Sequence, residues 1–99
     1  MKTPEGYVKD AVDKYLKSIG VRYVIKPATF GYGASGCPDR IFSVKGRMVS
    51  IEVKREGKTP TPLQRIRMKE LHADGAVAIW GDSFEMIKEK LREALGLPD

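Results

Sequence analysis

Residues 36–54, which read GCPDRIFSVKGRMVSIEVK, limit what this chain can fold into more than any other segment. Two β-prone runs, at about Arg40–Val44 and Met48–Lys54, lie on either side of a short turn at Lys45–Arg47. Two such runs joined by a short connection predict an antiparallel β-hairpin. Any fold for this chain must therefore accommodate two neighbouring antiparallel strands.

The second strand of this hairpin has two chemically different faces. Side chains alternate along a strand, so Val49, Ile51 and Val53 are expected on one face. Glu52 and Lys54 then share the opposite face. One face of the hairpin should pack into a core, and the other carries an acid beside a lysine.

The segments around the hairpin predict three helices and two more strands. Thr followed by Pro marks two helix starts, and TPLQ at 61–64 is a capping box. Apolar residues at helical spacing or in short β-branched runs define the remaining segments. The predicted elements are a helix from Pro4 to Gly20, strands at 21–26, 40–44 and 48–54, a helix from Pro62 to about His72, a strand at 76–80, and a last helix capped by Asp82 or Ser83.

This αβββαβα order predicts an α/β fold. We expect a small mixed sheet of about four strands flanked by helices, with the first three strands antiparallel and the fourth joined through a crossover helix. A chain of 99 residues makes a single domain, 1–99. A core of this size is thin, so a partner subunit would help to stabilise it.

Positive charge is concentrated in one part of the chain. The net charge is +5, and residues 45–70 contain eight basic and three acidic side chains. The rest of the chain contains ten of each and balances to zero. A basic stretch over a hairpin and the following helix is typical of proteins that bind a polyanion, although a solvated basic surface would look the same.

The composition also limits where in the cell the protein is expected and which ligands could hold a metal. No apolar run approaches the ~20 residues that span a bilayer, and the first ten residues lack the apolar stretch of a signal peptide. We expect a cytoplasmic protein, in the host cytoplasm if it is viral, with no membrane partner. Cys37 and His72 are the single cysteine and histidine, too few for a structural zinc site, so oxygen ligands would have to hold any metal.

Asp39 and Glu52 are two acids in otherwise β-prone or apolar surroundings. The hairpin can bring Asp39 opposite the end of the strand that carries Glu52 and Lys54. Two adjacent carboxylates repel unless a cation lies between them, and hard oxygen ligands suit Mg²⁺ or Mn²⁺. The alternative is an ordinary turn residue, Asp39, next to a surface ion pair.

These residues also carry a family resemblance. PD at 38–39 followed by EVK at 52–54 resembles the core of the PD-(D/E)xK nuclease superfamily, which has a restriction-endonuclease-like fold. The segments GCPDRIF, IEVKREGKTPTPLQ and HADGAVAIW resemble, more narrowly, the virus-type replication-repair nuclease (VRR-Nuc) domain. The resemblance extends from Glu5 to about Trp80.

The resemblance implies roles for individual residues of this sequence. Asp39 and Glu52 would bind Mg²⁺ or Mn²⁺ together with the backbone carbonyl of Val53, and Lys54 would be the catalytic lysine. Gln64 would be the family's glutamine on the following helix, although the capping box already accounts for a glutamine there. Glu5 would be the acid of the first helix that approaches the site, on the buried face shared with Val8 and Val12, although an acid also suits a first helical turn.

Other residues are candidates for contact with DNA. Basic side chains that flank the proposed site would hold phosphates, and the glycine-rich segment could let the backbone approach nucleic acid. Each could equally be plain surface or a loop. The candidates are Arg55, Lys58, Arg65, Arg67, Tyr32 and Ser35.

The resemblance therefore implies a metal-dependent endonuclease that hydrolyses DNA phosphodiester bonds. Stand-alone members of the family are associated with phage and bacterial replication and repair, and with symmetric dimers that act on branched DNA such as four-way junctions. The alternative from another class is a basic DNA-binding module without catalysis. A sequence-specific restriction nuclease is less favoured, because the chain has no room for a separate recognition domain.

Overall fold

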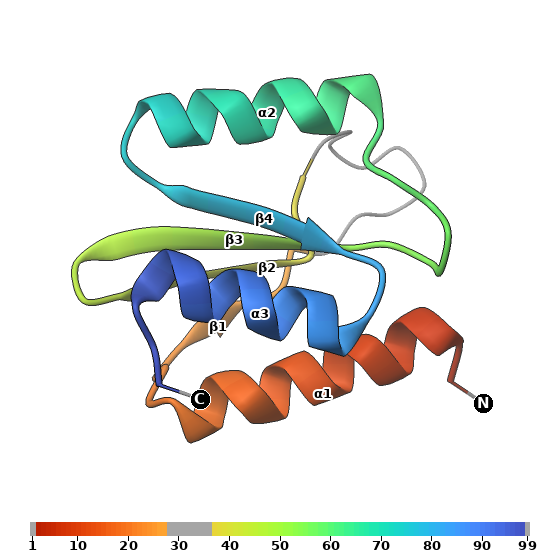
Figure 1. Cartoon of the computed structure of the whole chain (residues 1–99), viewed down its shortest axis with the longest axis horizontal. Coiled ribbons are helices and arrows are strands. Elements are labelled where there is room, and N and C mark those ends of the chain that lie inside the picture. The colour runs from red at the N-terminus through yellow and green to blue at the C-terminus, as the bar shows by residue number, and fades with distance from the viewer. Residues whose placement is uncertain (1, 28–36, 99) are drawn as a thin grey trace.

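The computed structural model describes residues 2–27 and 37–98 (Figure 1). Within these residues the predicted αβββαβα order is confirmed, with three helices and four strands. The elements are α1 (Pro4–Ser18), β1 (Val24–Ile25), β2 (Arg40–Val44), β3 (Arg47–Val53), α2 (Pro62–Ala73), β4 (Val77–Gly81) and α3 (Phe84–Leu95).

The four strands form one mixed sheet in the order β1-β2-β3-β4. The pairs β1–β2 and β2–β3 are antiparallel, and β3–β4 is parallel with α2 as the crossover. Lys45 and Gly46 form the hairpin turn, and their φ angles of 51° and 76° are both positive. Turns with two positive φ angles match the twist of antiparallel strands, which explains the tight connection.

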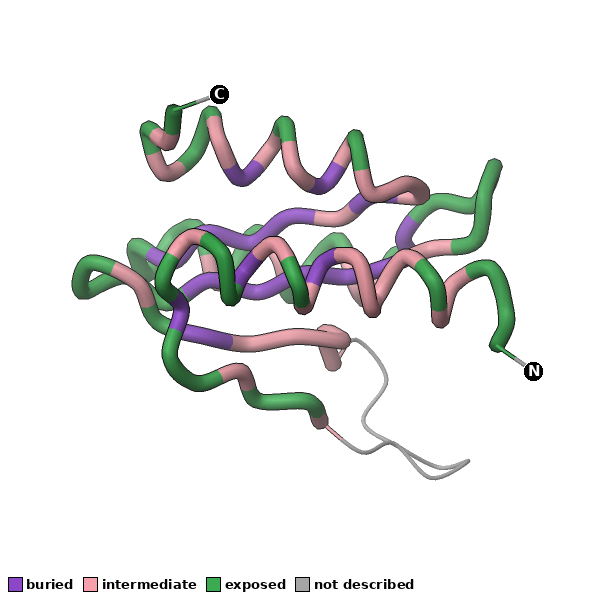
Figure 2. The backbone as a smooth tube through the Cα atoms, turned by 90° about the horizontal axis from the view of Figure 1, so that it is seen from below, coloured by how far each residue is buried: buried purple, intermediate pink, exposed green. Residues whose placement is uncertain are grey.

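The sheet has helices on both faces (Figure 1). Helices α1 and α3 pack against each other and against the sheet on one side, and α2 lies on the other side over β4. Buried positions lie along the central strands and on the inner sides of α1 and α3 (Figure 2). The core comprises Val49, Ile51 and Val53 of β3 with Val12, Leu16, Ile87 and Leu91, as the alternation in the hairpin predicts.

The first strand is shorter than the sequence predicts. We expected 21–26, whereas β1 contains Val24 and Ile25 alone, paired with Phe42 and Ile41. Val21 is buried, and its N–H group bonds to the carbonyl of Leu16 at 3.0 Å. This β-branched residue therefore closes the end of α1 and fills the core instead of extending a strand.

Hydroxyl side chains fix where the helices begin. Thr3 accepts a hydrogen bond from the N–H of Gly6 at 3.1 Å, as expected for the first helix. Ser83, one of the two predicted candidates, caps α3 by accepting from the N–H of Met86. Asp82 instead accepts from the N–H of Gly57 at 3.1 Å and so ties the start of α3 to the loop after β3.

Side chains cover the outer edge of β4. His72 Nε2 lies 2.9 Å from the carbonyl oxygen of Ala78, and Lys90 Nζ donates to the carbonyl of Trp80 at 2.7 Å. Lys90 also lies over the Trp80 ring, 4.4 Å from its centroid. Occupied carbonyls make this edge a poor template for another strand. In the described part of the chain, no helix is both long and apolar enough to cross a membrane.

Candidate functional site

The end of the β2–β3 hairpin brings Asp39 and Glu52 together. The ladder pairs Arg40 with Ile51, and the N–H of Asp39 then donates to the carbonyl of Ile51 at 2.9 Å. Asp39 Oδ2 accepts a hydrogen bond from the N–H of Val53 at 2.7 Å. The Asp39 carboxylate is therefore anchored to the strand that carries Glu52, at the place where the hairpin pattern predicts it.

Glu52 is an acid in an unfavourable environment. The residue is only 9% exposed, on the sheet face that α2 covers. Burial, together with the nearby negative charge of Asp39, raises the pKa of its carboxyl to about 8, although the ammonium groups of Lys54 and Lys9 offset part of the rise. A cation placed beside this pair would relieve both desolvation and repulsion.

Lys9 of α1 is a member of the site that sequence reasoning missed. Its Nζ lies 3.2 Å from Asp39 Oδ1, and both side chains are half-buried. A signal was present, because Glu5, Lys9 and Asp13 recur every four residues and so lie on one stripe of the first helix. The structure places this charged stripe along the end of the hairpin.

Asp13, the third residue of that stripe, holds α1 against β2. Arg40 donates from Nε to Asp13 Oδ1 at 2.7 Å and from Nη2 to Asp13 Oδ2 at 3.0 Å. Burial would raise the pKa of Asp13, but the hydrogen bonds from Arg40 and Lys26 outweigh it and lower this pKa. Arg40 also donates from Nη1 to the carbonyl of Asp39 at 2.8 Å. The helix, the strand and the first proposed ligand are thereby fixed together.

Lys54 and Glu5 line one cleft between the start of α1, the end of β3 and the start of α3. The cleft has a volume of about 560 Å³. Lys54 is half-buried, and its N–H donates to the carbonyl of Gly81 at 2.9 Å, so its backbone extends the β3–β4 pairing by one step. The Oε1 atom of Glu5 lies 3.8 Å from Arg55 Nε. Glu5, which was expected on the buried face of the helix, is half-buried, with its side chain 32% exposed on the rim of the cleft.

Gln64 both helps to cap helix α2 and borders the crevice that contains Glu52. Its Oε1 accepts from the N–H of Thr61 at 2.9 Å, and its own N–H donates to Thr61 Oγ1 at 3.1 Å, which completes the predicted capping box. Gln64 also lies with Glu52 and Ser50 in the wall of a narrow crevice between α2 and the sheet. The helix cap thus places this amide beside the buried acid.

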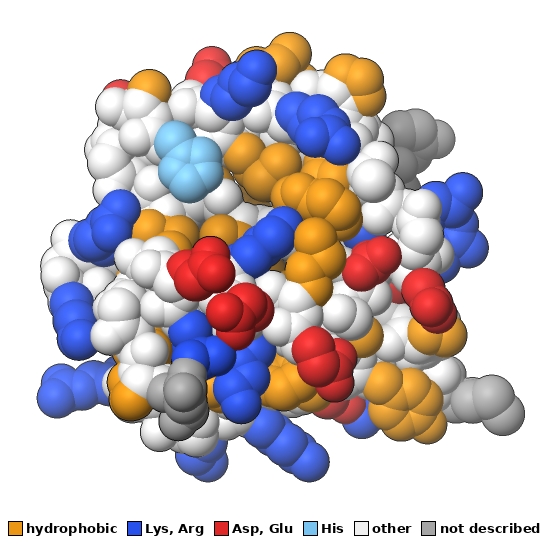
Figure 3. Space-filling view, viewed as in Figure 1, with side chains coloured by type: hydrophobic (Ala, Val, Ile, Leu, Met, Phe, Trp, Pro, Cys, Tyr) orange, Lys and Arg blue, Asp and Glu red, His pale blue; other side chains and the backbone are white. Residues whose placement is uncertain are grey.

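The candidate DNA-contacting residues that the structure describes lie on the exposed surface. Arg55, Lys58, Arg65 and Arg67 are all exposed, and Arg67 forms an ion pair with Glu70 at 2.7 Å. Lys and Arg side chains are interspersed with Asp and Glu on the face in Figure 3. Tyr32 and Ser35 lie outside the described residues.

The residues present suit a hard divalent cation. Asp39 and Glu52 supply carboxylate oxygens, and the backbone of Val53 lies beside Asp39 through the hydrogen bond described above. Over residues 2–27 and 37–98, no three His, Cys, Asp or Glu side chains cluster into a ligand set. A cation here would take two side chains and complete its coordination with backbone and water oxygens, which Mg²⁺ tolerates.

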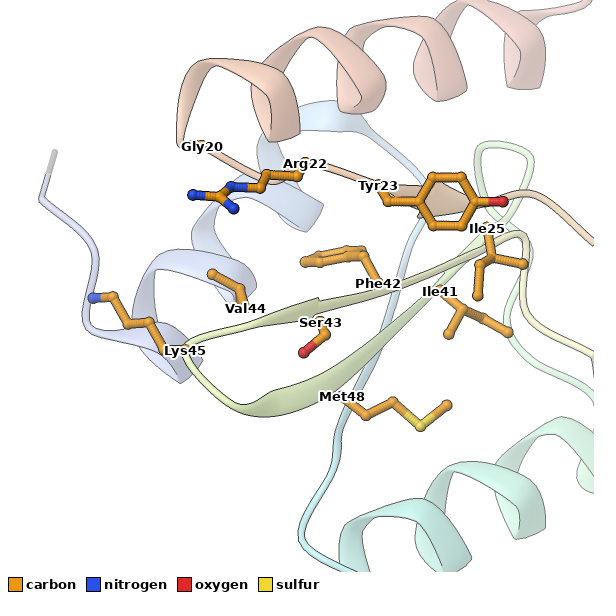
Figure 4. A pocket seen from close by; sticks show the side chains of 10 residues that line it. All are labelled: Gly20, Arg22, Tyr23, Ile25, Ile41, Phe42, Ser43, Val44, Lys45 and Met48. Carbon is orange, nitrogen blue, oxygen red and sulfur yellow. The ribbon is translucent and has the colours of Figure 1, made fainter.

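A separate cavity of about 640 Å³ lies at the β1 edge of the sheet, away from the two acids. Figure 4 shows Tyr23, Ile25, Ile41 and Met48 around its apolar part and Arg22 and Lys45 on its other side. Neither Asp39 nor Glu52 borders it. We call this cavity the β1 groove.

Comparison with known proteins agrees with the geometry. No protein-family model matches the chain, and no curated protein matches it. A solved structure of a VRR_NUC domain superposes with a TM-score of 0.75 and 29% sequence identity, covering 93% of this chain and 97% of that one. The shared fold extends over nearly the whole of both chains. The chain therefore has the fold of a VRR-Nuc domain.

Proposed function

We propose that this chain is a VRR-Nuc nuclease, a Mg²⁺- or Mn²⁺-dependent endonuclease that hydrolyses DNA phosphodiester bonds. The observation that carries the proposal is the buried Glu52 carboxylate beside Asp39, with Lys54 two residues further along the same chain segment. Two like charges in a partly buried place are costly to a fold, and a role in binding a cation explains why they lie together.

Each residue has a specific task in this proposal. Asp39, Glu52 and the carbonyl of Val53 would hold the cation, which polarises a phosphodiester and lowers the pKa of a bound water when it is present. Lys54 would neutralise charge that develops on the phosphate or orient the attacking water. Glu5 and Gln64 border the two hollows on either side of these residues and would position the DNA or the water.

The wider substrate preference is also part of the proposal. We infer that the domain acts as a homodimer on branched DNA, such as a four-way junction, in phage or bacterial replication and repair. Paired cuts in a two-fold symmetric substrate require two sites, and a symmetric dimer supplies them. The exposed cations Arg55, Lys58, Arg65 and Arg67 would contact the phosphates.

A cleavage assay tests this function. Labelled linear, nicked, flapped and four-way DNAs are incubated with the protein and with Mg²⁺, Mn²⁺ or EDTA. We expect cuts only with a divalent cation, and most strongly in the four-way or flapped substrates. If the wild-type protein cuts none of these DNAs with either cation, the enzyme proposal is wrong.

Variants separate catalysis from binding. Asp39→Asn, Glu52→Gln and Lys54→Ala should each lower cleavage by about a thousandfold or more, while salt-sensitive DNA binding stays within about threefold of wild type. The matched controls Asp74→Asn, Glu93→Gln and Lys14→Ala change exposed residues of the same types and should cut normally.

The competing function is a basic DNA-binding module without catalysis. The exposed cations favour it as much as they favour a nuclease, but it offers no reason for a buried acid pair. It predicts that Lys54→Ala weakens binding and that added Mg²⁺ changes nothing. Binding and cleavage measured on the same variants therefore distinguish the two functions.

A further inference from the structure

Lys9 has a contact that the proposed chemistry does not use. Its ammonium lies 3.2 Å from Asp39 Oδ1. We infer that Lys9 is a displaceable counter-ion, which holds the Asp39 carboxylate while the site lacks a divalent cation and leaves it when the cation binds. The inference rests on the proposed function, because it assigns Lys9 a part in loading the same site.

The two oxygens of Asp39 have different partners. Oδ2 accepts the N–H of Val53 at 2.7 Å, a bond that also fixes the orientation of the carboxylate. Oδ1 faces the Lys9 ammonium. A cation between Asp39 and Glu52 needs an oxygen lone pair from Asp39, and the charge of Lys9 is next to the oxygen that is not committed to the backbone. The lysine and the metal therefore compete for one carboxylate.

The lysine is able to move while the acid is not. Lys9 reaches Asp39 with a four-carbon side chain that is 30% exposed, and among the described residues Asp39 is its ion-pair partner. Asp39 is held through its side chain by Val53 and through its carbonyl by Arg40. An ammonium can leave by rotation about its side-chain bonds, whereas displacement of Asp39 would break the end of the hairpin.

A counter-ion of this kind has a measurable effect on metal affinity. It neutralises Asp39 in the metal-free protein, so the repulsion between Asp39 and the ionised form of Glu52 is reduced before any cation arrives. It also repels an arriving cation until it moves away. Replacing Lys9 with a neutral side chain of similar length removes both effects and should tighten metal binding.

Mn²⁺ titrations of the DNA-free full chain, followed by the EPR signal of free Mn²⁺, test the inference. We expect Lys9→Met to bind Mn²⁺ about fivefold to tenfold more tightly than wild type. Lys9→Arg keeps the charge and should stay close to wild type. Lys14→Met, an exposed lysine of the same helix, is the matched control and should not change the affinity.

Two further variants keep the test decisive. Lys9→Gln serves as the neutral variant if Lys9→Met does not fold, as judged by its thermal unfolding. In an Asp39→Asn background the effect of Lys9→Met should disappear, because the competition is for Asp39. An unchanged or weaker Mn²⁺ affinity in Lys9→Met would mean that Lys9 only supports the shape of the site, and would overturn the inference.

The failure of this inference can be told apart from the failure of the proposed function. A wild-type protein that neither binds Mn²⁺ nor cuts DNA contradicts the nuclease proposal itself. A wild-type protein that binds Mn²⁺ and cuts DNA, with no gain in affinity for Lys9→Met, contradicts the role of Lys9 alone.

Discussion

At the scale of single residues, Glu52 connects the stability of the fold with the chemistry of the site. Its pKa of about 8 arises first from burial and then from the charge of Asp39. An ordinary Glu pKa is 4.5, so between about pH 4.5 and pH 8 the native protein holds a proton that the unfolded chain has lost. The folded state binds more protons in this window, and its stability therefore falls as the pH rises through it.

Glu52→Gln should remove this pH dependence. The amide resembles the protonated acid and carries no charge at high pH, so we expect the variant to be more stable than wild type at pH 8–9 by up to a few kcal/mol. The difference should shrink steadily toward pH 5. Thermal unfolding of both proteins in EDTA across this range measures it.

The exposed acid Glu93 provides the control for this measurement. Glu93→Gln changes the same chemistry on the surface of α3 and should follow the wild-type pH profile. Saturating Mg²⁺ should make the stability of the wild-type protein less dependent on pH, since a bound cation favours the ionised carboxylate of Glu52. A wild-type stability that does not fall between pH 5 and pH 8 in EDTA would contradict the raised pKa.

At the scale of the elements, Gln64 is part of the α2 cap and of the crevice that contains Glu52. Thr61→Ala and Gln64→Ala each break the capping box and should each cost about 1 kcal/mol of stability. We expect Gln64→Ala to lose about tenfold more cleavage than Thr61→Ala, because only Gln64 also borders the proposed site. Cleavage rates at a temperature where both variants are fully folded measure this difference.

The comparison between the two cap variants decides what Gln64 does. Equal losses of cleavage in Thr61→Ala and Gln64→Ala would assign Gln64 to the helix cap alone. Normal cleavage by both variants would remove α2 from the catalytic site. Circular dichroism of the two proteins checks that α2 has formed in each of them.

The elements also differ in how far the sequence could predict them. The hairpin and the capping box depend on neighbouring residues, so local patterns were sufficient for them. The ladder then places Asp39 against β3, where the sequence predicts it. The shortened β1 was harder to foresee, because Val21 has strand propensity but is used by the end of α1 and by the core.

Contacts between elements distant in sequence could not be read from local patterns. Arg40 and Asp13 are 27 residues apart, and their pairing depends on how α1 packs across the hairpin. The same packing places Lys9 beside Asp39. The stripe of Glu5, Lys9 and Asp13 shows a charged helix face, but only the tertiary arrangement reveals which strand that face meets. The site is therefore predictable where it lies on the hairpin and unpredictable where α1 completes it.

At the scale of the whole molecule, the two edges of the sheet differ. His72 and Lys90 occupy carbonyls on the edge of β4, whereas the β1 groove is bordered by exposed apolar side chains. Tyr23 is 76% exposed and Met48 is 41% exposed. If the domain forms the proposed homodimer, the β1 edge is the better surface for it. Among residues 2–27 and 37–98, β1 pairs only with β2, so a strand edge and apolar side chains can both be buried there.

We therefore expect a dimer in solution that depends on Tyr23. Light scattering during gel filtration should give about twice the chain mass of 11.0 kDa, and Tyr23→Ser should weaken the dimer about tenfold or more, because a tyrosine at an interface contributes much of its binding energy. Tyr7→Ser is the matched control, since Tyr7 is 62% exposed on α1, away from the groove, and should leave the mass unchanged.

The salt dependence of the mass adds a second test of the same surface. Arg22 and Lys45 border the groove, so two copies meeting there bring like charges together, and added salt should strengthen the dimer by screening them. DNA binding should respond in the opposite direction, because salt weakens contacts to phosphates. Weak dimers form at protein concentrations on the order of 100 µM, so a monomeric mass at that concentration would contradict the homodimer. A dimer that is equally tight in Tyr23→Ser and Tyr7→Ser would place the interface elsewhere.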